Sequence, residues 1–176
     1  PPPHQRSSAA SDVYKRQLAH IGRNGHPPSV PLNLVGDFGG GSLFLIAGIL
    51  AALVAVSNGN DGQIIDAAMV DGAAYLASPL FSAYQSGFWS NQRGTNLLDS
   101  GAPFYDVYEC KCGDFLATGA IEPQFYKQLL MGLGFDPDEI PPQNNKEHWR
   151  ETKDKFAARF LTCLLYTSDA ADDLWC

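Results

Sequence analysis

PLNLVGDFGGG, residues 31–41, places one carboxylate, Asp37, between a short apolar run and three consecutive glycines. A long apolar segment follows at once and predicts a helix over Ser42–Val56. Glycines let a backbone approach a ligand closely, and a helix start offers unpaired N–H groups and the positive end of a dipole. Asp37 therefore stands where an anionic or enolate-like group could be held, although aspartate before glycines is also common as a turn residue or helix cap.

The segment after the glycines is apolar on every side of a helix, which is typical of a helix covered on more than one face in a layered α/β protein. Its apolar run, Leu43–Val56, is shorter than the about 20 residues of a bilayer span, so we expect no membrane partner. Asn58–Gly62 ends this helix with turn residues. A short strand over Gln63–Asp66 and a second helix over Ala67–Ser86 are predicted to follow.

The composition changes over residues 87–101, which we expect to link two domains. Phe104–Glu109 and Asp114–Thr118 are short strand candidates around Gly113 and predict a β-hairpin. Glu122 precedes a proline at a first helical position, which predicts a helix that ends at Gly134. The last predicted element is a charged, amphipathic surface helix over His148–Phe160.

The two ends of the chain carry related sequences. Residues 7–17 read SSAASDVYKRQ and residues 163–173 read CLLYTSDAADD, and one DNA sequence read on opposite strands encodes both. Such an inverted repeat is typical of a translated sequencing-library adaptor. We therefore expect residues 1–17 and 163–176 to be artefactual and exclude them from the interpretation of the fold.

Charge and cysteine content exclude several functions. The net charge of −7 argues against a nucleic-acid groove, which needs clustered Lys and Arg. Only Cys110 and Cys112 lie outside the predicted artefactual ends, with no second Cys or His pair at a suitable spacing, so neither a metal site nor a disulfide framework is predicted. A cytoplasmic location is the default for reduced cysteines without a recognisable targeting segment, with peroxisomes or mitochondria as alternatives in a eukaryote.

Four segments carry a resemblance to a known family: LNLVGDFGGG (32–41), GQIIDAAMVDG (62–72), GAPFY (101–105) and GAIEPQFY (119–126). They resemble the racemase branch of the family III CoA-transferases, and the last is the most characteristic of that branch. The resemblance implies an α/β fold with a Rossmann-like large domain, a smaller α+β domain and an interlocked homodimer. Residues 18–86 would be part of the large domain, 87–101 a linker and 102–162 part of the small domain.

The resemblance also implies an activity and two site residues. The activity is racemisation of 2-methylacyl-CoA thioesters by 1,1-proton transfer through an enolate, with no cofactor beyond the acyl-CoA substrate. Asp37 stands at the position of the family's acid/base aspartate. Glu122 stands at the position of a glutamate that hydrogen-bonds and orients the family's catalytic histidine.

The catalytic histidine itself has no counterpart here. It belongs to a segment of the type His-Asp-Ile-Asn-Tyr, which does not occur in this sequence. His20 and His26 fall in the loop before the Asp37 motif and are poor substitutes, and His148 is interpreted as a surface residue. The family's CoA contacts come mostly from the region before this chain, so no CoA-binding residue is assigned.

Two other hypotheses stay open. In a family III CoA-transferase, an aspartate at the Asp37 position attacks the thioester, and the GAIEPQFY segment with Glu122 counts against this reaction. A non-catalytic relative or inactive fragment is the third. Because layers of the fold would be missing, we expect the chain alone to expose apolar faces, to be poorly soluble and to show little or no activity.

Overall fold

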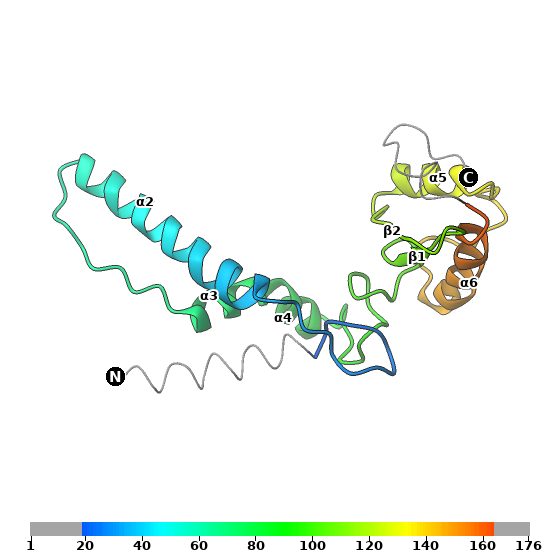
Figure 1. Cartoon of the computed structure of the whole chain (residues 1–176), viewed down its shortest axis with the longest axis horizontal. Coiled ribbons are helices and arrows are strands. Elements are labelled where there is room, and N and C mark those ends of the chain that lie inside the picture. Colours follow the sequence, from blue (N-terminus) through cyan, green and yellow to red (C-terminus); the bar gives the residue numbers. More distant parts are fainter. Residues whose placement is uncertain (1–18, 164–176) are drawn as a thin grey trace. The chain divides into compact units, whose positions relative to one another are not determined.

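The computed structural model describes residues 19–163, so the predicted artefactual ends lie outside the described residues except for Cys163. The chain forms two compact units, one that ends at Asn91 and one that begins at Gln92. Figure 1 shows the long helix α2 of the first unit and the hairpin with its helices in the second.

In the first unit, a loop over residues 19–33 leads into a π-helix, η1 (Leu34–Ser42), that continues directly into helix α2 (Leu43–Ser57). The Phe38 N–H donates to the Asn33 carbonyl at 3.1 Å, a bond that spans five residues. The helix predicted over Ser42–Val56 is therefore present, but Asp37 lies inside a helix and not ahead of one. Asn60 helps to end α2, because its main-chain N–H donates to the Ala55 carbonyl at 3.1 Å and its Nδ2 donates to the same oxygen at 3.0 Å.

Two predictions for the first unit are wrong. Gln63–Asp66 forms no strand: among the described residues this unit has no strand with which it could pair, and Ile64 is 99% exposed. The single helix predicted over Ala67–Ser86 is divided into α3 (Met69–Leu76) and α4 (Ser78–Gln85). Pro79 explains the break, because its ring removes a main-chain donor and crowds the carbonyl four residues earlier.

Helix α2 has no buried residue. This confirms the expectation that the chain by itself exposes the apolar faces of this helix. Together η1 and α2 form a helix of 24 residues with a mean hydropathy of 2.2, long and apolar enough to cross a membrane by length and composition. The length argument against a membrane span, drawn from Leu43–Val56 alone, is therefore wrong; a core helix of a soluble protein passes the same test.

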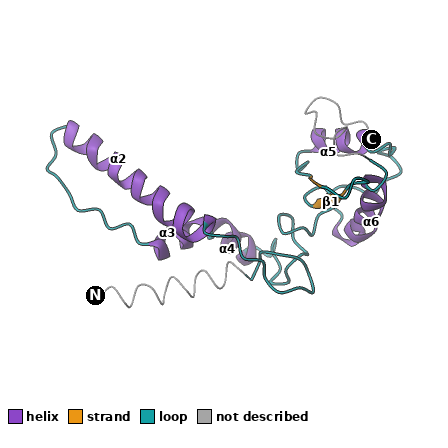
Figure 2. Ribbon diagram, viewed as in Figure 1, coloured by secondary structure: helices purple, strands orange, loops and turns teal. Residues whose placement is uncertain are grey.

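The second unit contains a two-stranded antiparallel sheet and its covering helices (Figure 2). Strands β1 (Val107–Glu109) and β2 (Phe115–Ala117) pair with Tyr108 opposite Leu116. The predicted hairpin is confirmed, with shorter strands, and Gly113 supplies a left-handed turn at φ +84°. Helix α5 (Pro123–Gly132) and helix α6 (Trp149–Phe160) occupy the two predicted helical segments, and a short 3₁₀ helix that was not predicted, η2 (Lys146–His148), leads into α6.

Aromatic side chains form the core of the second unit. Phe104 and Phe156 are fully buried. Tyr108 of β1 stacks on Phe160 of α6 with ring centroids 4.8 Å apart, and Phe104 meets the Trp149 ring edge-on at 5.9 Å. The amphipathic pattern of α6 thus has a physical cause: one face covers the hairpin and the opposite face carries the charges.

Candidate active site

Asp37 is presented by the wide turn of η1. Its side chain is exposed, while its main-chain carbonyl accepts a hydrogen bond from the Ser42 hydroxyl at 3.0 Å. π-Helical turns are uncommon and occur frequently at functional sites. The backbone around Asp37 is therefore held in a specific turn, and its carboxylate faces solvent where a ligand can reach it.

The three glycines after Asp37 have a different role from the one expected. They were predicted to leave the backbone open to a ligand, but α3 covers them. A Cβ on Gly40 would lie 2.7 Å from the Ala73 nitrogen, and a Cβ on Gly39 would lie 2.9 Å from Leu76 Cδ1. Because Gly40 is buried, close helix packing explains the glycine run, and the group offered to a ligand is the Asp37 side chain.

Glu122 stands immediately before α5. Its main-chain carbonyl accepts the Tyr126 N–H at 2.9 Å, whereas its side chain makes no capping hydrogen bond to the helix. The carboxylate is exposed. A capping function, which is the usual role of a carboxylate at such a position, therefore does not account for Glu122.

Asp37 and Glu122 belong to different units. Each unit is described by itself, so the structure does not bring the two carboxylates together. Their cooperation in one site stays a prediction.

Two of the histidines have identified partners. The Trp89 indole N–H donates to His20 Nδ1 at 3.2 Å, and the two rings meet edge-on at 5.9 Å. His20 therefore helps to hold the largely buried Trp89, and its Nδ1 serves as an acceptor. His148 lies 3.4 Å from Glu151 on an exposed face, which confirms its interpretation as a surface residue.

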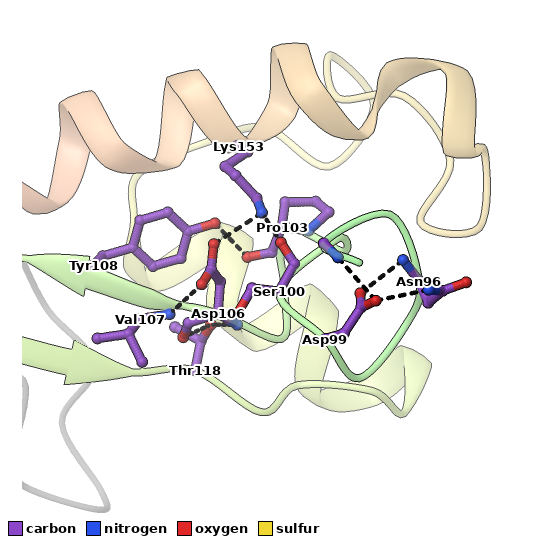
Figure 3. A network of polar contacts seen from close by, with 10 residues as sticks. Asn96, Asp99, Ser100, Pro103, Asp106, Val107, Tyr108, Thr118 and Lys153 are labelled. Atoms are coloured by element: carbon purple, nitrogen blue, oxygen red, sulfur yellow. Dashed lines mark hydrogen bonds and ion pairs between the residues drawn. The ribbon is translucent and has the colours of Figure 1, made fainter. Parts of the chain in front are cut away.

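The second unit contains a buried polar network that was not predicted from the sequence (Figure 3). The Asp99 carboxylate, 7% exposed, accepts the Gly94 N–H at 2.9 Å and the Asn96 N–H at 2.7 Å. Asn96 Nδ2 also donates to this carboxylate at 2.6 Å. Gly101 packs against the same loop, because a Cβ there would lie 2.3 Å from the Asn96 carbonyl oxygen. The Asn-x-x-Asp spacing in a Gly-rich segment was the available signal for such a loop.

A second part of the network joins Asp106, the residue before β1, to α6. The Lys153 ammonium lies 2.8 Å from the Asp106 carboxylate, whose side chain is 2% exposed. Lys153 also donates to the Ser100 carbonyl, and the Tyr108 hydroxyl donates to the Pro103 carbonyl at 2.5 Å. The GAPFY segment, residues 101–105, is thereby anchored on the hairpin and α6, which gives this motif a structural role.

Among residues 19–163, no group of three or more His, Cys, Asp or Glu side chains could hold a metal ion. Cys110 is a buried free thiol and Cys112 an exposed one. Burial raises the pKa of Cys110, and the neighbouring Cys112 and Asp114 raise it further.

Comparisons with known proteins agree with the motifs. The sequence model of CoA-transferase family III matches residues 15–171. The chain is 50% identical to the mouse alpha-methylacyl-CoA racemase over 143 residues, which are 81% of this chain and 38% of that protein. The human alpha-methylacyl-CoA racemase is 49% identical over 81% of this chain and 37% of its own length. A CaiB/baiF CoA-transferase family protein of Caenorhabditis elegans is 34% identical over 79% of this chain and 43% of its own length. The chain thus spans about two fifths of the length of these relatives.

Proposed function

The chain belongs to CoA-transferase family III, and we propose on this premise that its protein racemises 2-methylacyl-CoA thioesters. One observation carries the proposal: over 81% of its length, the chain is 50% and 49% identical to two alpha-methylacyl-CoA racemases. The exposed carboxylate of Asp37 agrees with it. The C. elegans protein, which is named only for the wider CoA-transferase family, is less similar at 34% identity.

The proposed chemistry moves one proton and leaves every other bond in place. The thioester carbonyl acidifies the α-carbon, so a base on one face can take its proton and leave an enolate. An acid on the opposite face then protonates the same carbon and inverts its configuration. Asp37 is the acid/base group on one face in this proposal, and a histidine of the type that the family resemblance implies acts on the other.

Glu122 has an orienting role in the proposed site. A carboxylate that accepts the second ring N–H of a histidine fixes its tautomer and stabilises its protonated form. Glu122 suits this task because its carboxylate is exposed and is not used to cap α5. The reaction needs no redox group, so acyl-CoA is the only small molecule that we propose to bind. We also propose a homodimer, and a cytoplasmic location that agrees with the free thiols of Cys110 and Cys112.

A full-length hybrid tests the proposal. The matching segment of the mouse relative is replaced by the 143 residues of this chain that align with it. The hybrid is incubated with one enantiomer of a 2-methylacyl-CoA in heavy water. Deuterium at the α-carbon is measured by mass spectrometry, and racemisation by chiral chromatography. Asp37→Asn is compared with Asp61→Asn, a matched substitution at another exposed aspartate of the first unit.

We expect deuterium uptake with racemisation in the hybrid and in Asp61→Asn, and loss of racemisation in Asp37→Asn. Transfer of CoA to a free acid without α-exchange, together with a hydroxylamine-sensitive adduct on Asp37, would instead assign the transferase reaction. In that reaction Asp37 attacks the thioester carbonyl and expels the CoA thiolate. A folded hybrid that catalyses neither reaction would favour a non-catalytic relative.

A further inference from the structure

Helix α3 packs on η1 through the main chain of glycine residues, with no side chain between the two helices at that point. A Cβ on Gly72 of α3 would lie 1.9 Å from the Gly40 carbonyl oxygen, and a Cβ on Gly40 would lie 2.7 Å from the Ala73 nitrogen. We call this approach of Gly72 to Gly40 the glycine contact. Both glycines are buried. No side chain can be added at Gly72 unless the two helices separate, because the atom that it would meet belongs to the backbone.

The glycine contact acts on the turn that holds Asp37. Gly40 lies three residues after Asp37 in the same π-helix. Hydrogen bonds enclose the turn on both sides: Phe38 N–H donates to the Asn33 carbonyl at 3.1 Å, and the Ser42 hydroxyl donates to the Asp37 carbonyl at 3.0 Å. A shift of Gly40 therefore moves the backbone that carries the Asp37 carboxylate.

We propose that Gly72 is a positioning residue for Asp37, which sets the place of the carboxylate through the glycine contact without touching the substrate. This inference rests on the proposed function and extends it from the acid/base group to the helix behind it. An acid/base group must lie within hydrogen-bond reach of the reacting carbon's proton. A displacement of about 1 Å can cost about 100-fold in rate.

The neighbouring glycines provide a graded series. A Cβ on Gly39 would meet Leu76 Cδ1 at 2.9 Å, and one on Gly41 would meet Met69 Cγ at 3.1 Å. A Cβ on Gly39 would also lie 3.0 Å from the Leu34 carbonyl oxygen, a main-chain atom of η1, whereas the nearest atom to a Cβ on Gly41 belongs to a side chain that can move aside. Gly72→Ala is therefore expected to disturb Asp37 most, Gly39→Ala less and Gly41→Ala least.

Hydrogen exchange in the full-length hybrid tests the structural half of the proposal. Amide exchange of peptides that cover residues 34–42 is measured by mass spectrometry in Gly72→Ala and in Gly62→Ala. Gly62 is the matched control, because a Cβ there would meet no atom within 4 Å and its φ is not left-handed. We expect faster exchange over residues 34–42 in Gly72→Ala alone. Equal exchange in the two variants would overturn the proposal.

Face-selective exchange in the full-length hybrid tests the catalytic half. In a two-base racemase, one base lies on each face of the α-carbon, and each base removes the α-proton of one enantiomer. We expect Gly72→Ala to slow deuterium uptake from the enantiomer whose proton faces Asp37 by about 10- to 100-fold. We expect uptake from the other enantiomer, and the KM for both, to change by less than about threefold. Asp37→Asn should show the same selectivity, and Gly62→Ala none.

The outcomes separate the possible failures. An equal loss on both faces would mean that Gly72 only stabilises the fold, and no loss would mean that the contact does not act on Asp37; either overturns the proposal. If Gly72→Ala does not fold, the milder Gly39→Ala must show the same selective loss. An unaltered hybrid with no α-exchange overturns the proposed function, and the exchange over residues 34–42 then still shows whether Gly72 fixes the turn.

Discussion

Lys153 and Asp106 form a partly buried ion pair, with 25% and 2% of their side chains exposed. Lys153→Met would remove this ammonium group from the buried Asp106 carboxylate. We expect a loss of about 3 kcal/mol in the unfolding free energy of the second unit, at the low end for a broken buried pair because Lys153 is partly solvated. Urea titration followed by hydrogen exchange of α6 peptides measures this loss.

Lys155→Met is the matched control on the same helix. Lys155 lies 2.8 Å from Glu151, with 39% and 56% of the two side chains exposed, so their pairing adds little to stability. The urea midpoint of Lys155→Met should equal that of the unaltered chain. A similar loss in the two variants would show that the network at Asp106 does not depend on its cation.

Cys110 and Cys112 should differ in reactivity although they are two residues apart. Burial, with further contributions from Cys112 and Asp114, raises the pKa of Cys110 above its ordinary value of 9.0. At pH 8 the folded chain therefore holds less Cys110 thiolate, the form that reacts, than the unfolded chain does. We expect iodoacetamide to label Cys112 first and Cys110 only in urea, as peptide mapping will show. Equal labelling rates in the folded chain would contradict the burial of Cys110.

At the residue scale, the sequence identified the exposed groups better than the buried ones. Asp37 and Glu122 could be named because a motif carries them. The pairing of Asp106 with Lys153 could not, since it depends on how α6 lies on β1 and the two residues are far apart in sequence. The role of the glycines after Asp37 was missed for the same reason: their neighbours, Ala73 and Leu76, come from another helix.

At the scale of elements, the sequence predicted the features that depend on residues close by in the chain. The turn at Gly113, the proline that starts α5 and the amphipathic pattern of α6 each lie within a few residues of the structure they specify. The predicted strand over Gln63–Asp66 failed because a strand depends on a partner that its own sequence does not contain. The break at Ala77 had a local signal, Pro79, that the prediction of one long helix overlooked.

The packing of helix α6 on the second unit should depend on the side chain of Phe156. Its ring is fully buried and lies 5.7 Å from that of Phe135 and 6.3 Å from that of Tyr108. Phe156→Ala would leave a cavity between α6 and β1, and we expect a loss of about 4 kcal/mol in unfolding free energy. Leu161→Ala, at the end of the same helix with 51% of its surface exposed, is the control and should cost less than about 1 kcal/mol. Urea unfolding of both variants measures the two losses. Similar losses of unfolding free energy in the two variants would contradict this packing of Phe156.

At the scale of the whole molecule, the large apolar surface of α2 governs behaviour in solution. Leu50 is 57% exposed, and Leu53 and Val54 are each 60% exposed. Monomeric proteins rarely leave so continuous an apolar surface in water. The chain also spans only about two fifths of the length of its relatives. We therefore expect the isolated chain to self-associate and to show no α-proton exchange above background.

Replacement of α2 side chains tests the cause of this association. Leu50→Gln with Leu53→Gln keeps residues that favour a helix but removes apolar surface. We expect the double variant to approach the monomer mass of 19.1 kDa in light scattering, whereas the unaltered chain forms larger species whose mass rises with concentration. Met131→Gln with Leu161→Gln, at two residues of the second unit that are each 51% exposed, is the matched control and should remain associated. A monodisperse unaltered chain that melts cooperatively would contradict the prediction.

Lipid vesicles distinguish the two environments that such a helix can occupy. If other parts of the folded protein cover η1 and α2, the full-length hybrid should be soluble and should stay in the aqueous phase when it is floated with phosphatidylcholine vesicles. If the 24-residue helix Leu34–Ser57 inserts, the hybrid should float with the vesicles and residues 43–57 should resist added protease. We expect the first result, because insertion would place the Asp37 carboxylate in or near the apolar layer, where burial of a charge is costly. Co-flotation with protease protection would therefore argue against both the absence of a membrane partner and the proposed role of Asp37.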